Sequence, residues 1–144
     1  MGLSQSCEIK LKNKFQRGNR NLITDIPGAR VGQVTLQNAE KAIHTGVTVI
    51  LPHGGNLFKE KVPAGVSIIN GFGKSAGLIQ VQELETIETP IVMTNTFGVG
   101  TALNALTKYM LEENEDIGVH TGTVNCLVTE CNDGMLNDIR GMHL

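Results

Sequence analysis

Runs of apolar residues along the chain predict five strands. Residues 30–36 (RVGQVTL) alternate apolar and polar positions, as a strand buried on one face does. Residues 45–51 (TGVTVIL) are rich in β-branched side chains and stop at Pro52, so this strand should end in a loop. Three further runs have the same character. The expected strands are 30–36, 45–51, 65–69, 91–94 and 123–129.

Two segments have the spacing of amphipathic helices. From Val99 the apolar residues fall at 99, 102, 103, 106 and 110, which predicts a helix that ends near Glu113 and Asn114. Residues 75–84 predict a shorter helix. Asn95 or Thr96 could cap the longer helix, or the loop that contains them could line a pocket.

The order of these elements predicts the fold class. Strands come first, followed by helix, strand, helix and strand, which indicates an α/β sandwich in which helices cover one face of a mixed sheet. The other face of the sheet would still need cover. Residues 1–20 are polar and basic without a clean period, so we expect a leader arm there and a single α/β domain over residues 21–144.

Composition narrows the function classes. Aromatic residues are scarce, with four Phe, one Tyr and no Trp, so the core must be aliphatic. A net charge of −2 with dispersed Lys and Arg does not favour nucleic acid. No apolar run approaches the ~20 residues of a membrane span, and no secretory signal is evident. The three cysteines have no C-x-x-C spacing, which indicates reduced thiols of a cytoplasmic protein.

The first residues fit one targeting pattern. Residues 1–6 (MGLSQS) match M-G-x-x-x-[ST], the myristoylation signature, and Cys7 with nearby basic residues could add a second membrane signal. The alternative is a chance match in a polar leader. We favour the chance match, because so short a pattern recurs by accident.

Glycine-bearing loops follow several of the expected strands. Residues 70–74 (NGFGK) could bind an anion through backbone N–H groups and Lys74, or could simply form a tight turn before a helix. His53, beside Gly54 and Gly55, could be a base or a ligand. No histidine has a partner at metal-ligand spacing, so we do not expect a metal site.

Glu130 is the most informative polar residue, because an apolar strand runs directly into it. A partly desolvated carboxylate at a strand end is well placed to bind a cation such as a substrate ammonium group. Cys131 could be a nucleophile, but no histidine lies near it in sequence. Both Cys131 and Cys126 are otherwise expected to be small buried hydrophobic residues.

These segments together resemble the L-aminopeptidase/D-esterase and β-peptidyl aminopeptidase family of self-processing hydrolases. The resemblance covers residues 21–140 in order. It includes NLITDIPGARVG (21–32), HTGVT (44–48), LPHGGNLF, KVPAG, NGFGK, TNT (94–96) and the turn after Glu130 that ends in LNDI. It implies an αββα sandwich, oligomers of processed chains, no cofactor, and a precursor that cuts itself ahead of a serine. That serine becomes an N-terminal nucleophile.

Two departures from the family pattern change what we expect. The family continues beyond the position of Leu144 to the cleavage site and the serine, so we expect no catalytic residue within these 144 residues. The family's tyrosine, expected to help stabilise the oxyanion, is replaced by Met135, which cannot donate a hydrogen bond. Glu130 matches the glutamate expected to hold the substrate's amino group. By the same resemblance, Asn95 and Asn132 are expected to bind substrate.

The sequence therefore leaves two main functions open. The chain is either the N-terminal portion of an aminopeptidase that acts on small peptides, amides or esters, or an inactive relative. The first function requires a nucleophile-bearing partner chain. The second would bind small amine ligands or modulate an active homologue. Self-association through an uncovered sheet is a further possibility.

Overall fold

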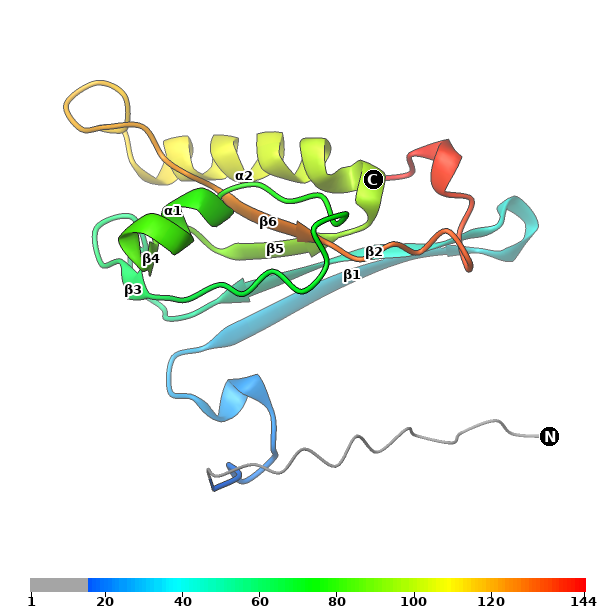
Figure 1. The fold of residues 1–144 in the computed structure, drawn as a ribbon, viewed down its shortest axis with the longest axis horizontal. Coiled ribbons are helices and arrows are strands. Elements are labelled where there is room, and N and C mark those ends of the chain that lie inside the picture. Colours follow the sequence, from blue (N-terminus) through cyan, green and yellow to red (C-terminus); the bar gives the residue numbers. More distant parts are fainter. Residues whose placement is uncertain (1–15) are drawn as a thin grey trace.

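The computed structural model describes residues 16–144 and places a four-stranded sheet at the centre of the fold (Figure 1). The order of strands in the sheet is β1-β2-β5-β6. β1 and β2 form a long antiparallel hairpin, β2 and β5 are antiparallel, and β5 and β6 are parallel. The strands are β1 (Arg30–Asn38), β2 (Ile43–Leu51), β5 (Ile91–Thr94) and β6 (Leu127–Glu130).

A long helix covers one face of the sheet. α2 (Val99–Glu113) has the predicted bounds, because its apolar positions recur every three or four residues. Its inner face packs on Val92 and Val128 of the sheet, and the same core contains Leu106, Met110, Ile117 and Cys126. Asn95 does not cap α2 itself, whose N-cap is Gly98 without a side-chain hydrogen bond. It caps the short 3-10 turn Thr96–Gly98 that leads into α2, where its Oδ1 accepts a hydrogen bond from the backbone N–H of Gly98 at 2.8 Å.

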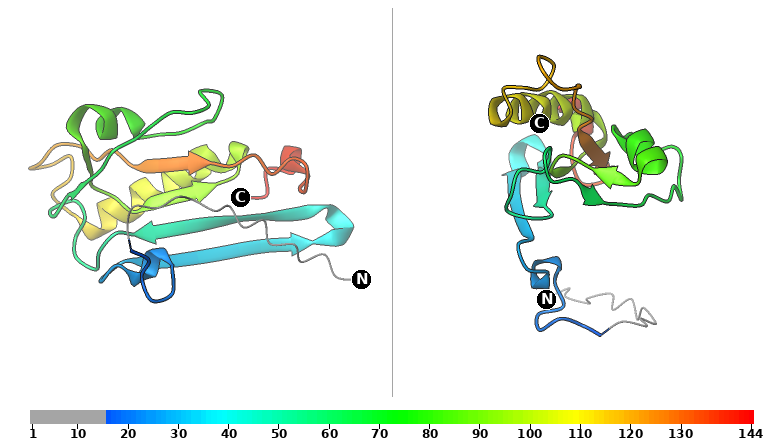
Figure 2. Two further views of the ribbon diagram at one scale, coloured as in Figure 1. Left: turned by 60° about the horizontal axis from the view of Figure 1, so that its bottom comes forward. Right: turned by 90° about the vertical axis from the view of Figure 1, so that its left-hand side faces the viewer.

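A second, smaller layer packs on the opposite face. Successive residues of a strand point to opposite faces, so Ile91 and Leu127 face away from α2. They contact a core that contains Val81 of α1 (Leu78–Leu84) and Ile87 of β4. β4 (Thr86–Ile87) pairs with β3 (Val62–Pro63) to form a two-stranded sheet. α2 and α1 therefore lie on different sides of the central sheet (Figure 2).

The predicted α/β class with a mixed sheet and helices is confirmed, while three local predictions are wrong. Residues 65–69 form no strand, and Ile69 is 99% exposed, because no strand of the described residues pairs with this segment. The strand predicted at 123–129 starts only at Leu127. The strand predicted at 30–36 forms, but all of its residues are exposed. Within residues 16–144, β1 pairs only with β2, and no described segment covers either of its faces.

The remaining elements agree with the sequence apart from their ends. The strand expected at 45–51 begins two residues earlier, and the helix expected at 75–84 begins at Leu78. No helix among residues 16–144 has the length and apolar character needed to cross a bilayer. The myristoylation pattern, Cys7 and most of the expected leader arm lie outside the described residues.

Candidate functional site

Glu130 lies where three loops converge. It is the last residue of β6 and pairs with Thr94, the last residue of the parallel strand β5. The carboxyl ends of the two strands therefore meet at one edge of the sheet, and the loops that follow them start side by side. The loop at residues 70–74 reaches the same edge from the other side of β6, since Ala76 bridges to Val128.

Both oxygens of the Glu130 carboxylate accept hydrogen bonds. The backbone N–H of Lys74 donates to Oε1 at 3.0 Å, and the hydroxyl of Thr96 donates to Oε2 at 2.5 Å. These donors fix the orientation of the carboxylate without neutralising its charge. Among residues 16–144 no basic side chain forms an ion pair with Glu130. The result is a half-buried, oriented anion that can accept a small cation.

The loop at 70–74 combines both uses that its sequence allowed. It is a tight turn, since the backbone N–H of Phe72 donates to Asn70 Oδ1 at 3.0 Å. It also binds an anion through a backbone N–H, but that anion is the protein's own Glu130. The sequence did not reveal Thr96 as a second donor, because only the parallel pairing of β5 and β6 brings it to Glu130.

The two asparagines expected at the site differ in their surroundings. Asn95 is 3% exposed, and its Nδ2 donates to Thr45 Oγ1 at 3.1 Å while its Oδ1 caps the turn before α2. It holds β2 and the start of α2 in place, and its direct contact with substrate stays a prediction. Asn132 is exposed, and its Oδ1 accepts from the N–H of Gly134 at 2.9 Å.

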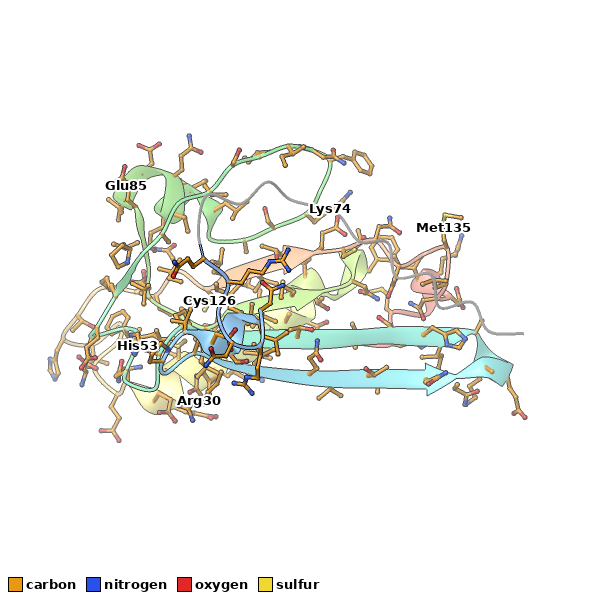
Figure 3. All side chains as sticks on the ribbon, turned by 90° about the horizontal axis from the view of Figure 1, so that it is seen from below. Arg30, His53, Lys74, Glu85, Cys126 and Met135 are labelled. Carbon is orange, nitrogen blue, oxygen red and sulfur yellow. The ribbon has the colours of Figure 1, made fainter. Side chains whose placement is uncertain are left out.

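Met135 projects into solvent from a braced turn near the same end of the sheet. Its side chain is 98% exposed. Asn137, in the same turn, accepts a hydrogen bond from the backbone N–H of His44, and the N–H of Asp138 donates to the carbonyl of Ala42 at 2.7 Å. The turn is thus anchored to the β1–β2 hairpin. Figure 3 shows Met135 toward one end of the molecule and His53 toward the other, with Lys74 between them.

His53 is held by the backbone at both ring nitrogens. Its Nε2 lies 2.8 Å from the carbonyl oxygen of Glu60, and its Nδ1 accepts from the N–H of Gly55 at 3.0 Å. A base or a metal ligand would need a free ring nitrogen, but both ring nitrogens of His53 already contact the backbone. His53 therefore stabilises its loop. Within residues 16–144 no group of three His, Cys, Asp or Glu side chains could hold a metal ion.

The two described cysteines differ in burial, so the expectation that both are buried is right for Cys126 and wrong for Cys131. Burial raises the pKa of the Cys126 thiol, which lies 3.5 Å from Thr107 Oγ1. We expect iodoacetamide to alkylate Cys131 in the folded protein and to reach Cys126 only when the core opens. Peptide mapping by mass spectrometry tests this order. Equal rates at both thiols would contradict the packing around α2.

An open apolar groove lies beside α2, on the face of the sheet that α2 covers in part. Its volume is about 510 Å³. The hydroxyl of Thr94, which lies at this groove, has no hydrogen-bond partner among residues 16–144, although Thr94 is only 5% exposed. The lining is otherwise mostly aliphatic side chains of β2 and the flank of α2: Val47, Val49, Leu51, Pro90, Val92, Gly98, Thr101, Ala102, Ala105, Leu106, Tyr109 and Leu144. This part of the sheet lacks a cover among the described residues.

Comparisons with known proteins agree with the resemblance. The model of peptidase family S58 matches residues 21–144. The chain is 33% identical over 134 residues to a β-peptidyl aminopeptidase, BapA, of Sphingosinicella microcystinivorans, covering 88% of this chain and 33% of that protein. The chain thus spans about one third of the length of this relative.

Two solved structures have the same fold over most of this chain. The PH0078 protein of Pyrococcus horikoshii OT3 gives a TM-score of 0.86 at 56% identity, covering 91% of this chain and 39% of that one. The L-aminopeptidase D-Ala-esterase/amidase of Ochrobactrum anthropi gives 0.75 at 30% identity, covering 89% and 38%. The latter is described as a prototype for the serine aminopeptidases and a new variant among the Ntn hydrolase fold.

Proposed function

Because the chain belongs to peptidase family S58, we propose that it is the amine-binding portion of an aminopeptidase. The reaction is removal of N-terminal residues from small peptides, amides or esters. The serine that attacks the scissile carbonyl comes from outside these 144 residues, and the present chain holds the amino end of the substrate. An active site shared between this chain and another segment fits a chain that spans 33% of the length of a β-peptidyl aminopeptidase relative.

The arrangement around Glu130 carries the proposal. An N-terminal residue differs from the rest of a peptide by its free ammonium group, so an exopeptidase needs an anion at a fixed position. Glu130 supplies that anion, and Lys74 N–H and Thr96 Oγ1 orient it. Without a basic side chain of residues 16–144 in an ion pair with it, the carboxylate is free to bind substrate.

The open groove supports a requirement for a further segment. Apolar sheet surface that stays in water is unfavourable, and the buried hydroxyl of Thr94 has no hydrogen-bond partner in the described part of the chain. A nucleophile-bearing partner chain that covers the groove would bury this surface and complete the active site. A second copy of the chain is the other candidate for this cover. The exposed thiol of Cys131 supports a reducing, cytoplasmic location.

The second candidate function is an inactive relative that binds small amines. One observation favours it, namely that Met135 stands where the resemblance expects an oxyanion-stabilising tyrosine. Both candidates share the ammonium site at Glu130. They differ in the turnover expected when a nucleophile-bearing segment is supplied.

Binding of a free amine tests the shared part of both candidates. We expect β-alaninamide to shift NMR signals of residues around Glu130 in a saturable way, whereas N-acetyl-β-alaninamide should not bind. Glu130→Gln should weaken binding by roughly 10-fold to 100-fold, because a charge-assisted hydrogen bond is lost. Glu112→Gln, on the exposed side of α2, is the matched control. Equal binding of the acetylated amide would contradict the ammonium site.

A further inference from the structure

Lys74 contacts Glu130 with its backbone but not with its charge. Its N–H donates to Glu130 Oε1 at 3.0 Å. Its ammonium group instead donates to the carbonyl oxygen of Phe72 at 2.9 Å and lies 3.6 Å from the centroid of the Phe72 ring. The Lys74 ammonium group is therefore held on the face of the Phe72 ring and not at the Glu130 carboxylate.

Lys74 is well placed to compete with a substrate for Glu130. A lysine whose own amide contacts a carboxylate carries a flexible four-carbon stem that can bring its ammonium group to the same carboxylate. Such an ion pair would occupy the anion that the proposed function reserves for the substrate. Something must therefore favour the observed position of the Lys74 ammonium group.

Phe72 provides the alternative position. Phe72 is 78% exposed, so its ring is accessible to the Lys74 ammonium group. The backbone of Phe72 is fixed, since its N–H donates to Asn70 Oδ1 at 3.0 Å and the N–H of Gly73 donates to the Asn70 carbonyl at 3.4 Å. The turn thus presents the ring in one place for the cation to stack on.

We propose that Phe72 is a positioning residue that holds the Lys74 ammonium group away from Glu130 and so keeps the amine-binding site open. This inference rests on the proposed function of Glu130. An exposed cation–π contact and an exposed ion pair have comparable strengths, so losing the ring is enough to shift the balance. We expect Phe72→Ala to weaken amine binding by about threefold to fivefold, because Lys74 then competes for the carboxylate.

NMR on the full 144-residue chain tests the proposal with two readouts. The first is the chemical shift of the Lys74 ε-methylene protons, which should be upfield in the native chain through the ring current of Phe72 and should lose that shift in Phe72→Ala. The second is titration with β-alaninamide. Binding should weaken in Phe72→Ala, should be restored in the double variant Phe72→Ala with Lys74→Gln, and should be kept in Phe72→Trp.

Each contrary outcome has a distinct meaning. Unshifted ε-protons in the native chain, or unchanged affinity in Phe72→Ala, would overturn the role of Phe72. Weak binding that persists in the double variant would also overturn it, because Phe72 would then act by contacting the ligand or by supporting the loop. Absence of any binding by the native chain would remove the proposed function of Glu130, while the proton shifts would still test the Lys74–Phe72 contact.

Discussion

Lys61→Met is expected to lower the free energy of unfolding by about 3 kcal/mol, because it leaves a buried carboxylate without its counter-charge. Lys61 and Glu88 form an ion pair in which the Glu88 side chain is 6% exposed. Glu88 Oε1 also accepts from the N–H of Asn125 at 2.9 Å. The Lys61 side chain is 41% exposed, so water screens part of the pair, and we place the cost at the low end of the range for buried pairs.

The pair joins three segments that are distant in sequence: the loop before β3, the connection from β4 to β5, and the approach to β6. Urea unfolding followed by circular dichroism measures the effect. Lys59→Met is the control, since Lys59 is exposed and forms no ion pair among the described residues. It should change stability by less than about 0.5 kcal/mol. Equal losses of unfolding free energy in the two variants would show that Lys61 does not stabilise the buried Glu88 carboxylate.

Met135→Tyr is expected to raise the turnover of a reconstituted enzyme by roughly 10²-fold to 10³-fold, the usual worth of one oxyanion donor. The methionine thioether cannot donate a hydrogen bond, whereas a tyrosine hydroxyl can. The position is favourable for such a gain. The Met135 side chain is 98% exposed, so a larger side chain meets no obstacle, and the turn is braced through Asn137 and Asp138.

The measurement requires the proposed nucleophile-bearing segment. The remaining part of the 56% identical Pyrococcus horikoshii relative can be co-expressed with this chain, and a complex isolated by gel filtration can be assayed with β-alanyl-p-nitroanilide. Leu136→Tyr is the control, because Leu136 is also exposed and occupies the next position of the turn. If Met135→Tyr raises the turnover of the isolated complex no more than Leu136→Tyr does, then a side chain at position 135 does not reach the oxyanion.

The sequence predicted those elements whose burial is set locally. The apolar period of three and four residues gave the bounds of α2, and the β-branched run that stops at Pro52 gave the end of β2. Prediction from the sequence failed where the burial of a segment depends on residues distant in the chain. The segment at 65–69 has strand-like composition but pairs with no strand in the part of the chain that the structure describes. β1 alternates apolar and polar residues as a half-buried strand does, yet all of its residues are exposed.

The sequence predicted the carboxylate of the candidate site but not the groups that donate hydrogen bonds to it. A strand that runs into Glu130 marks a carboxylate at a sheet edge. Thr96 and Lys74 lie 34 and 56 residues away in sequence, and only the pairing of β6 with β5 and with Ala76 brings them to that carboxylate. The exposure of Cys131 follows from the same geometry, because the chain leaves the sheet immediately after Glu130.

Release of p-nitroaniline from β-alanyl-p-nitroanilide by the purified 144-residue chain is the most direct test of the account. In this account the chain holds the amine end of the substrate at Glu130, while the attacking hydroxyl comes from elsewhere. We therefore predict no release above the rate in buffer. Turnover by the pure chain, at a rate proportional to its concentration and abolished in Glu130→Gln, would contradict the account, because a complete hydrolytic centre would then lie within these residues.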